Sequence, residues 1–189
     1  ELLPTGFIRD EIVGRIEALR AAEGGYLAEI SYAVETAAGE LTQLINVIFG
    51  NISIKPGIRV VEVNMPPSLL AEFKGPRFGR EGLRQKLGIA KRPILFTALK
   101  PMGLSSQELA DLAYQFALGG IDIIKDDHGL TNQSFAPFEE RVRLCVAAVA
   151  KANRDSGHNA VYVPNVTAPA DQVLGRARLA KEMGAGGLM

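Results

Sequence analysis

The stretch PILFTALKPMGLSSQELADLAYQFALGGIDIIKDD, residues 93–127, decides the fold. It opens with a continuous apolar run at residues 94–99, which is typical of a strand buried on both faces. Residues 105–118 then show helical periodicity behind a serine that can cap the helix, and Gly119-Gly120 ends it. Because residues 121–124 are a second apolar strand, the stretch predicts a βα unit with parallel strands.

The same rhythm continues to the end of the chain, with a helix expected at residues 138–153, a strand at 160–163 and a helix at 170–183. Such strands need helices packed over them, which leaves a doubly wound sheet or a (β/α)8 barrel. No glycine-rich phosphate turn follows the first strand, and polar residues end each strand, as they do at the catalytic face of barrels. The pattern therefore favours the first units of a TIM barrel, a fold of about 250 residues.

The first half of the chain has a different organisation. We expect an α+β domain with its linker at residues 1–88 and the barrel segment at residues 89–189. A glycine- and arginine-rich segment at residues 73–80 is the natural linker. The expected elements before it are helices at residues 9–23 and 39–48 and strands at residues 26–34 and 57–64.

Both ends of the chain suggest a longer polypeptide. The chain opens in a proline-marked loop, Leu3-Pro4-Thr5, and closes on an apolar run at residues 186–189 that is typical of a strand just beginning. We therefore expect the chain to be truncated.

The composition excludes several functional classes. The 21 basic and 21 acidic residues balance to a net charge of zero, which argues against nucleic-acid binding and against a polybasic hold on a membrane. The apolar runs are far shorter than the roughly 20 residues that span a bilayer, and no signal peptide opens the chain, so we expect a cytoplasmic protein. The single cysteine, Cys145, lies in an apolar pattern and is expected to be a buried thiol, not a nucleophile.

Polar residues at the strand ends form the candidate site. Lys100 ends the first strand, and the second strand end carries Lys125, Asp126, Asp127 and His128. Neighbouring strands lie about 4.8 Å apart, so these side chains are expected to share one pocket. Lysines beside carboxylates suit Mg²⁺-assisted enolate formation. On spacing alone the alternative stays open that Lys100 is a solvated boundary residue and that the two aspartates form only a turn.

Four motifs then occur in order: Phe73-Lys74-Gly75-Pro76, residues 97–105, residues 119–127, and Asn165-Val166-Thr167-Ala168. In order and separation they resemble the large subunit of ribulose bisphosphate carboxylase (RuBisCO), over nearly the whole chain. The resemblance implies a ferredoxin-like α+β N-terminal domain followed by the first units of a (β/α)8 TIM barrel.

The resemblance also implies a role for each matched residue. Lys125 resembles the lysine that reacts with carbon dioxide to form a carbamate, and Asp127 resembles a carboxylate that binds Mg²⁺ beside it. Lys100 resembles the lysine that polarises the substrate carbonyl or the developing enolate, where a fixed positive charge is needed.

The remaining matches concern assembly and support of the site. Asn51 resembles the asparagine that the N-terminal domain of one subunit inserts into the barrel mouth of its partner, which implies a homodimer or a higher homo-oligomer. Asn165 and Thr167 match the third strand-end motif, and either a supporting role at the site or a purely structural role fits them.

Two departures from RuBisCO point to its RuBisCO-like, form IV relatives. His128 stands where RuBisCO has a glutamate ligand, which allows a softer metal or a histidine that acts as acid or base. The loop after Lys100 is shorter by a residue, and Met102 or Gly103 stands where a second catalytic lysine would be. Losing that lysine argues against carboxylation.

The resemblance therefore implies a lyase or carbon–carbon hydrolase that acts on a small sugar phosphate. We expect decarboxylation, or transcarboxylation with hydrolysis, of 3-oxo-isoapionate 4-phosphate, with Lys100, Lys125, His128 and Asn51 as catalytic residues and Lys125, Asp127 and His128 on the metal. The alternatives are a diketo sugar phosphate enolase or isomerase of the methionine-salvage type, and a catalytically silent binding relative.

Overall fold

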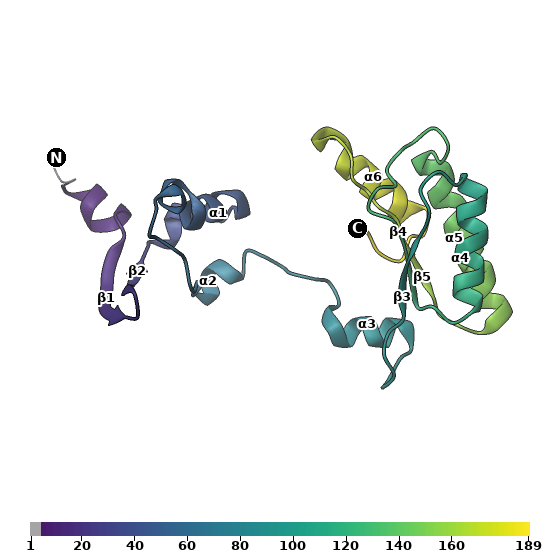
Figure 1. The fold of residues 1–189 in the computed structure, drawn as a ribbon, viewed down its shortest axis with the longest axis horizontal. Coiled ribbons are helices and arrows are strands. Elements are labelled where there is room, and N and C mark those ends of the chain that lie inside the picture. The colour runs from purple at the N-terminus through teal and green to yellow at the C-terminus, as the bar shows by residue number, and fades with distance from the viewer. Residues whose placement is uncertain (1–4) are drawn as a thin grey trace. The chain divides into compact units, whose positions relative to one another are not determined.

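The computed structural model describes residues 5–189, apart from the Ile52 side chain. The chain divides into two compact units, Glu1–Arg77 and Phe78–Met189, which Figure 1 colours from purple to teal and from teal to yellow. The loop expected at Leu3-Pro4 lies outside the described residues.

The second unit is built on the predicted parallel sheet. Its strands are β3 (Phe96–Leu99), β4 (Ile123–Asp126) and β5 (Val161–Val163), in the spatial order β3-β4-β5. β4 is parallel to both neighbours. Strands that follow one another in the chain are neighbours in the sheet and run parallel, which confirms the predicted βα units. Within the described residues the sheet is open and three-stranded, so the structure shows an α/β fold and not a closed barrel.

Two helices cover one face of this sheet. They are α4 (Ser106–Leu118) and α5 (Phe138–Ser156), which lie side by side in Figure 1, and a third helix, α6 (Ala170–Glu182), follows β5. The core under α4 and α5 includes Leu99, Ile124 and the Cys145 thiol, all fully buried. Burial raises the pKa of that thiol to about 12, as expected for a structural cysteine.

The start of α4 confirms the predicted cap. The Ser105 side chain accepts from the amide of Glu108, and the Glu108 carboxylate accepts from the amide of Ser105. This capping box satisfies amides that the first turn of a helix leaves free.

One helix of the second unit was missed by the sequence pattern. Helix α3 (Gly79–Leu87) contains Gly79 and Gly82, which lower helix propensity and led to the prediction of a linker that extends to residue 80. The helix forms because Leu83 and Leu87 pack against Ile123 of β4, on the sheet face opposite α4 and α5. Tertiary packing thus outweighs local propensity here.

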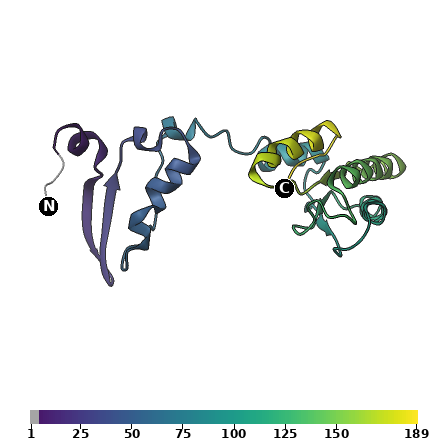
Figure 2. The same ribbon diagram turned by 90° about the horizontal axis from the view of Figure 1, so that it is seen from above.

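The helix predicted at residues 9–23 is wrong. The structure has a π-helical turn, η1 (Ile8–Ile12), and a strand, β1 (Arg15–Ala22), that pairs antiparallel with β2 (Gly25–Ser31); Figure 2 shows the pair from above. A β-bulge between Ile16 and Ala18 inserts a residue, so Ile16 and Leu19 share one face of the strand. The bulge gives these two apolar residues a three-residue spacing, which is also the spacing of apolar residues on one face of a helix. The sequence pattern therefore predicted a helix here.

The rest of the N-terminal unit is partly as predicted. Helix α1 (Leu41–Phe49) confirms the helix expected at residues 39–48, and the expected strand at 26–34 exists as the shorter β2. Residues 58–66 have no regular secondary structure, so the strand predicted at 57–64 is wrong. A β-branched run becomes a strand only with a ladder partner, and the described part of this unit has only the sheet β1-β2. The remaining short elements are η2 (Val34–Ala37), η3 (Asn51–Ile54) and α2 (Pro67–Leu70).

The last residues run beside β5. The amides of Gly186 and Met189 donate to the carbonyls of Tyr162 and Pro164 at 2.9 and 3.0 Å, and the amide of Val166 donates to Met189 at 2.9 Å. These bonds place residues 186–189 along the free edge of the sheet, although they are not assigned as a strand. Among the described residues, no helix combines the length and apolar character needed to cross a bilayer.

Candidate active site

The ends of β3 and β4 bring two predicted site residues into contact. Leu99 pairs with Asp126 in the parallel register, so Lys100 and Asp127 leave the sheet at the same level. Lys100 Nζ lies 3.2 Å from Asp127 Oδ1. The contact follows from parallel pairing, because both strands present their carboxyl ends at one edge.

His128 joins this pair. Its Nδ1 lies 3.4 Å from Asp127 Oδ1, so Asp127 stands between an amine and an imidazole. The Asp127 side chain is only 14% exposed, whereas those of Lys100 and His128 are 62% and 86% exposed. Partial burial alone would raise the pKa of the Asp127 carboxyl, but the hydrogen bond and charge of Lys100, with His128, lower it below its usual value. Asp127 is therefore an anion that is largely shielded from solvent and is in contact with the solvent-exposed ammonium of Lys100.

Lys125 is placed differently from Lys100. It pairs with Ala98 inside the sheet, is half-buried, and donates from Nζ to the carbonyl oxygen of Asp126 at 2.8 Å. The sequence predicted both lysine amines in one pocket with Asp127. Of these two amines, only that of Lys100 contacts the Asp127 carboxylate in the structure. Among the described residues, no three His, Cys, Asp or Glu side chains are grouped so as to hold a metal ion.

Asp126 turns away from the candidate site. Side chains alternate along a strand, so Asp126 faces the helices while its neighbours Lys125 and Asp127 face the other way. It is fully buried and bonds to Arg141 of α5 and Tyr162 of β5. The expectation that Asp126 shares the pocket of Asp127 is therefore wrong, and strand alternation is the reason.

Asn165 links the ends of β4 and β5. It is 1% exposed, and its side-chain amide donates to the carbonyl of His128 at 2.9 Å. Its carbonyl oxygen accepts from the amide of Thr167 at 2.9 Å. Asn165 thus contacts the backbone of a predicted site residue, whereas Thr167 contributes its backbone to the turn.

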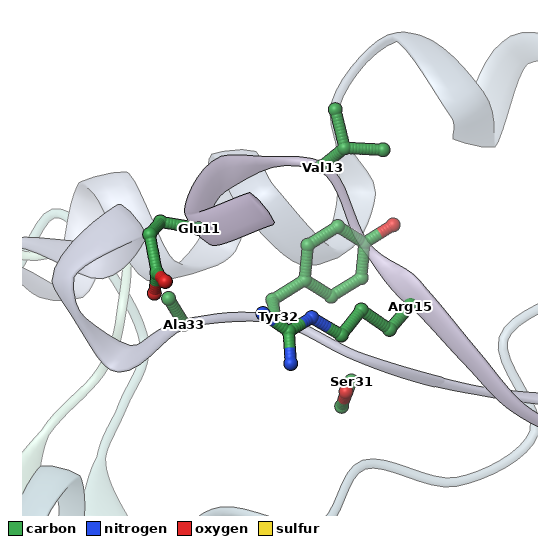
Figure 3. Close-up of a pocket in the computed structure, with 6 residues that line it drawn as sticks. All are labelled: Glu11, Val13, Arg15, Ser31, Tyr32 and Ala33. Carbon is green, nitrogen blue, oxygen red and sulfur yellow. The ribbon is translucent and has the colours of Figure 1, made fainter. Parts of the chain in front are cut away.

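Asn51 belongs to the N-terminal unit. It begins η3, one residue after the end of α1, and is exposed. A hollow of about 230 Å³ in the same unit, drawn in Figure 3, is lined by none of the predicted site residues. Its lining is Glu11, Val13, Arg15, Ser31, Tyr32 and Ala33.

Sequence reasoning missed Arg141. This fully buried arginine donates to Asp126 from the first turns of α5, fifteen positions further along the chain. Its only local signal is a basic residue beside Val142 on the apolar face of a helix, where a charge needs a partner.

Comparison with known proteins identifies the family. Residues 79–189 match the model of the ribulose bisphosphate carboxylase large chain, catalytic domain. The chain is 44% identical over 167 residues to ribulose bisphosphate carboxylase-like protein 1 of Rhodopseudomonas palustris, covering 88% of this chain and 45% of that protein. It is 38% identical over 179 residues to 5-methylthioribulose-1-phosphate isomerase of Rhodospirillum rubrum, covering 94% of this chain and 48% of that one.

Solved structures agree with the sequence matches. The dimeric archaeal Rubisco of Hyperthermus butylicus superimposes with a TM-score of 0.88 at 31% identity, covering 100% of this chain and 46% of the other. The chain spans about half the length of the curated relatives it matches. On these matches, the chain belongs to the RuBisCO large-chain superfamily, in its RuBisCO-like form.

Proposed function

We propose that the protein carries out metal-assisted enolate chemistry on a phosphorylated keto sugar acid. The observation that carries the proposal is the cluster of Lys100, Asp127 and His128 at the ends of two parallel strands. It combines a positive charge, an anion and an imidazole that can transfer a proton, at the edge where barrel enzymes hold their substrates.

Each member of the cluster has a distinct task in this proposal. The ammonium of Lys100, held by Asp127, donates a hydrogen bond to the oxygen on which negative charge develops. Asp127 also faces Nδ1 of His128, which leaves Nε2 of that imidazole to carry a proton to or from the substrate carbon. The exposure of Lys100 and His128 leaves both groups accessible to a substrate.

A metal site needs one ligand more than the unmodified side chains supply. Asp127 offers an oxygen, a carbamate on Lys125 would add a second oxygen, and His128 would add a nitrogen in an arrangement where its imidazole binds the ion instead of moving a proton. With that modification the donor set suits Mg²⁺ or, because of the imidazole, a softer divalent ion. When bound, the ion would supply Lewis acidity toward the substrate carbonyl.

Within this class we favour decarboxylation, or transcarboxylation with hydrolysis, of 3-oxo-isoapionate 4-phosphate. In decarboxylation the bond to the carboxylate carbon breaks, carbon dioxide leaves, and the electron pair becomes an enolate on the former keto oxygen. Lys100 stabilises that oxygen, and His128 returns a proton to carbon. The histidine in place of a glutamate at position 128 supports this choice.

The test is an assay of the purified protein with this substrate and Mg²⁺, following release of carbon dioxide and the sugar phosphate product. Lys100→Met should lower kcat by at least about 100-fold, because the developing oxyanion loses its donor. Lys151→Met is the matched control, since Lys151 pairs with Asp155 on the outer surface of α5, and its kcat should stay within about twofold of wild type. If wild type releases no carbon dioxide and forms no new sugar phosphate, this substrate assignment fails.

A second candidate is a diketo sugar phosphate enolase or isomerase. The similarity to the 5-methylthioribulose-1-phosphate isomerase of Rhodospirillum rubrum favours it. Incorporation of solvent deuterium into 5-methylthioribulose 1-phosphate, without loss of a carbon, would select this candidate over decarboxylation. A catalytically silent binding relative instead predicts that Lys125→Ala changes no turnover and no carbon dioxide-dependent metal binding.

The wider architecture is also part of the proposal. We propose residues 1–88 as a ferredoxin-like domain with its linker and residues 89–189 as the first three βα units of a TIM barrel. The linker then includes α3, which packs on the sheet of the second unit. The sequential parallel order of β3, β4 and β5 supports the barrel assignment. A homodimer, as in the archaeal neighbour, would let Asn51 of one subunit complete the site of the other.

A further inference from the structure

A buried polar network lies directly behind the candidate site. Both oxygens of the Asp126 carboxylate are engaged: Oδ1 accepts from the Tyr162 hydroxyl at 2.6 Å, and Oδ2 accepts from Arg141 Nε at 3.1 Å and from the amide of Asn165 at 3.0 Å. The four residues are at most 2% exposed. A charged pair removed from water this completely is costly unless its hydrogen bonds are satisfied, as they are here.

The network reaches the loop that follows β4. Arg141 donates from Nη1 to the carbonyl of Ala136 at 2.7 Å and from Nη2 to the carbonyl of Thr131 at 2.9 Å. Asn165 donates to the carbonyl of His128 at 2.9 Å. The loop from residue 128 to residue 136 is therefore held at three of its carbonyls by two buried side chains.

The same network joins the end of β4 to β5 and the turn that follows it. Asp126 is the last residue of β4, and its carboxylate is bonded to β5 through Tyr162 and to the turn after β5 through Asn165. Lys125 and Asp127 flank Asp126 on the other face of the strand. Any displacement of Asp126 therefore moves the backbone of both.

We propose that Asp126, Arg141, Tyr162 and Asn165 are positioning residues, which fix the loop after β4 and so set where His128 and Asp127 stand for catalysis. The inference assigns a role to the middle residue of Lys125-Asp126-Asp127, and it rests on the proposed function for its catalytic readout. A carboxylate used only for stability gains little from complete burial, because burial removes its hydration. Fixed geometry is what such a network supplies, and small displacements of catalytic groups are costly in rate.

The chain offers a matched control at the opposite end of β5. Asn153 of α5 donates to the carbonyl of Ala160 at 2.9 Å and accepts from the amide of Ala160 at 2.8 Å. Like Asn165 it uses both atoms of its side-chain amide on backbone groups, but before β5 instead of after it. Asn165→Ala and Asn153→Ala thus remove equivalent bonds at the two ends of one strand.

The experiment compares these two variants by hydrogen–deuterium exchange, read by mass spectrometry on the complete purified protein. In Asn165→Ala the amides of residues 128–136 should exchange about tenfold faster, while those of residues 157–161 keep the wild-type rate. Asn153→Ala should show the reverse. Arg141→Lys is a second variant: it keeps the charge beside Asp126, loses the two-pronged hold on Thr131 and Ala136, and should also speed exchange at residues 128–136.

The catalytic arm uses whichever of the two substrates above the wild type turns over. Asn165→Ala should lower kcat at least about tenfold with KM changed less, and Asn153→Ala should leave kcat within about twofold. Unchanged exchange at residues 128–136 in both Asn165→Ala and Arg141→Lys, or equal loss of kcat in the two asparagine variants, overturns the inference. If the wild type turns over neither substrate, the proposed function fails, and exchange at residues 128–136 alone decides whether the network holds the loop.

Discussion

Strand β4 has an aspartate and arginine pair at each end, and the two pairs differ in almost everything but composition. Before the strand, Asp122 accepts two bonds of 2.7 Å from Arg92, whose side chain is 53% exposed. At its end, Asp126 meets Arg141 at 3.1 Å, and both side chains are fully buried. The first pair lies at the edge away from the candidate site, and the second lies directly behind it.

The pKa shifts of the two aspartates run in opposite directions. The hydrogen bonds of Arg92 lower the pKa of the Asp122 carboxyl, because they outweigh the desolvation of a side chain that is only 10% exposed. Burial raises the pKa of the Asp126 carboxyl, although Arg141, Tyr162 and Asn165 all favour the carboxylate. The attraction of the arginine therefore sets the direction of the pKa shift at Asp122, whereas desolvation sets it at Asp126. A pair of the second kind contributes a defined geometry more than it contributes stability.

The largest effect should follow from removing one partner of the buried pair. Arg141→Met leaves the Asp126 carboxylate without a counter-charge in the core, and should lower the free energy of unfolding by about 3–5 kcal/mol. Urea denaturation of the purified protein measures this loss. Arg143→Met, at an exposed position on the same helix, is the control and should stay close to wild type. A loss no larger than that of the control would mean that an unpaired Asp126 carboxylate does not destabilise the folded protein.

A single hydroxyl gives a smaller test of the same contrast. Tyr162→Phe removes the 2.6 Å bond to Asp126 without changing the packed ring, and should cost about 1–3 kcal/mol because the acceptor is charged and buried. Tyr114→Phe removes a bond of 2.7 Å to the exposed Asp155, where water can replace the hydroxyl. Unfolding midpoints of the two variants should differ clearly, and equal midpoints would contradict the role given to burial.

The smallest effect is expected at the pair of Asp122 and Arg92, and it should depend on pH. Asp122→Asn should cost about 1 kcal/mol at neutral pH, because asparagine keeps an oxygen acceptor and Arg92 is 53% exposed to water. The folded-state pKa of Asp122 is lowered, so its stabilisation is present above the unfolded-state pKa of about 4 and is lost as the pH falls through the folded-state value. The gap between wild type and Asp122→Asn, measured by thermal unfolding, should therefore close in acid.

The buried pair should respond in the opposite sense. The folded-state pKa of Asp126 is raised, so protonation favours the folded state, and its ionisation costs stability as the pH rises from the unfolded-state pKa toward the folded-state value. Acid should therefore widen the gap between wild type and Asp126→Asn, because wild type gains stability as Asp126 is protonated and the asparagine does not titrate. A gap at Asp126 that closes in acid, as the gap at Asp122 does, would argue against the reversal.

Much of the second unit could be predicted because its signals are local. Apolar runs of strand length, a serine with a glutamate three positions on, and glycines after the helices indicate β3, α4 and β4 without knowledge of any partner. The contact of Lys100 with Asp127 also followed, because parallel strands align their carboxyl ends at one edge of the sheet.

The errors arose where structure depends on a distant partner. A bulge in β1 gave Ile16 and Leu19 a helical spacing, and α3 forms on the packing of two leucines that its local propensity does not reveal. The run at residues 57–64 has strand propensity but no ladder partner among the described residues. Propensity is a weak guide whenever pairing or packing supplies most of the free energy.

By itself, the sequence determined the order of the βα units and the kind of residue at each strand end, since both depend on short-range periodicity and on turn chemistry. Only the tertiary structure decided that Asp126 faces the core while Asp127 meets Lys100, and that Arg141, fifteen positions away, neutralises the buried carboxylate. The reason is physical: which groups leave water depends on which helix packs over the strand, and that contact joins residues far apart in the chain.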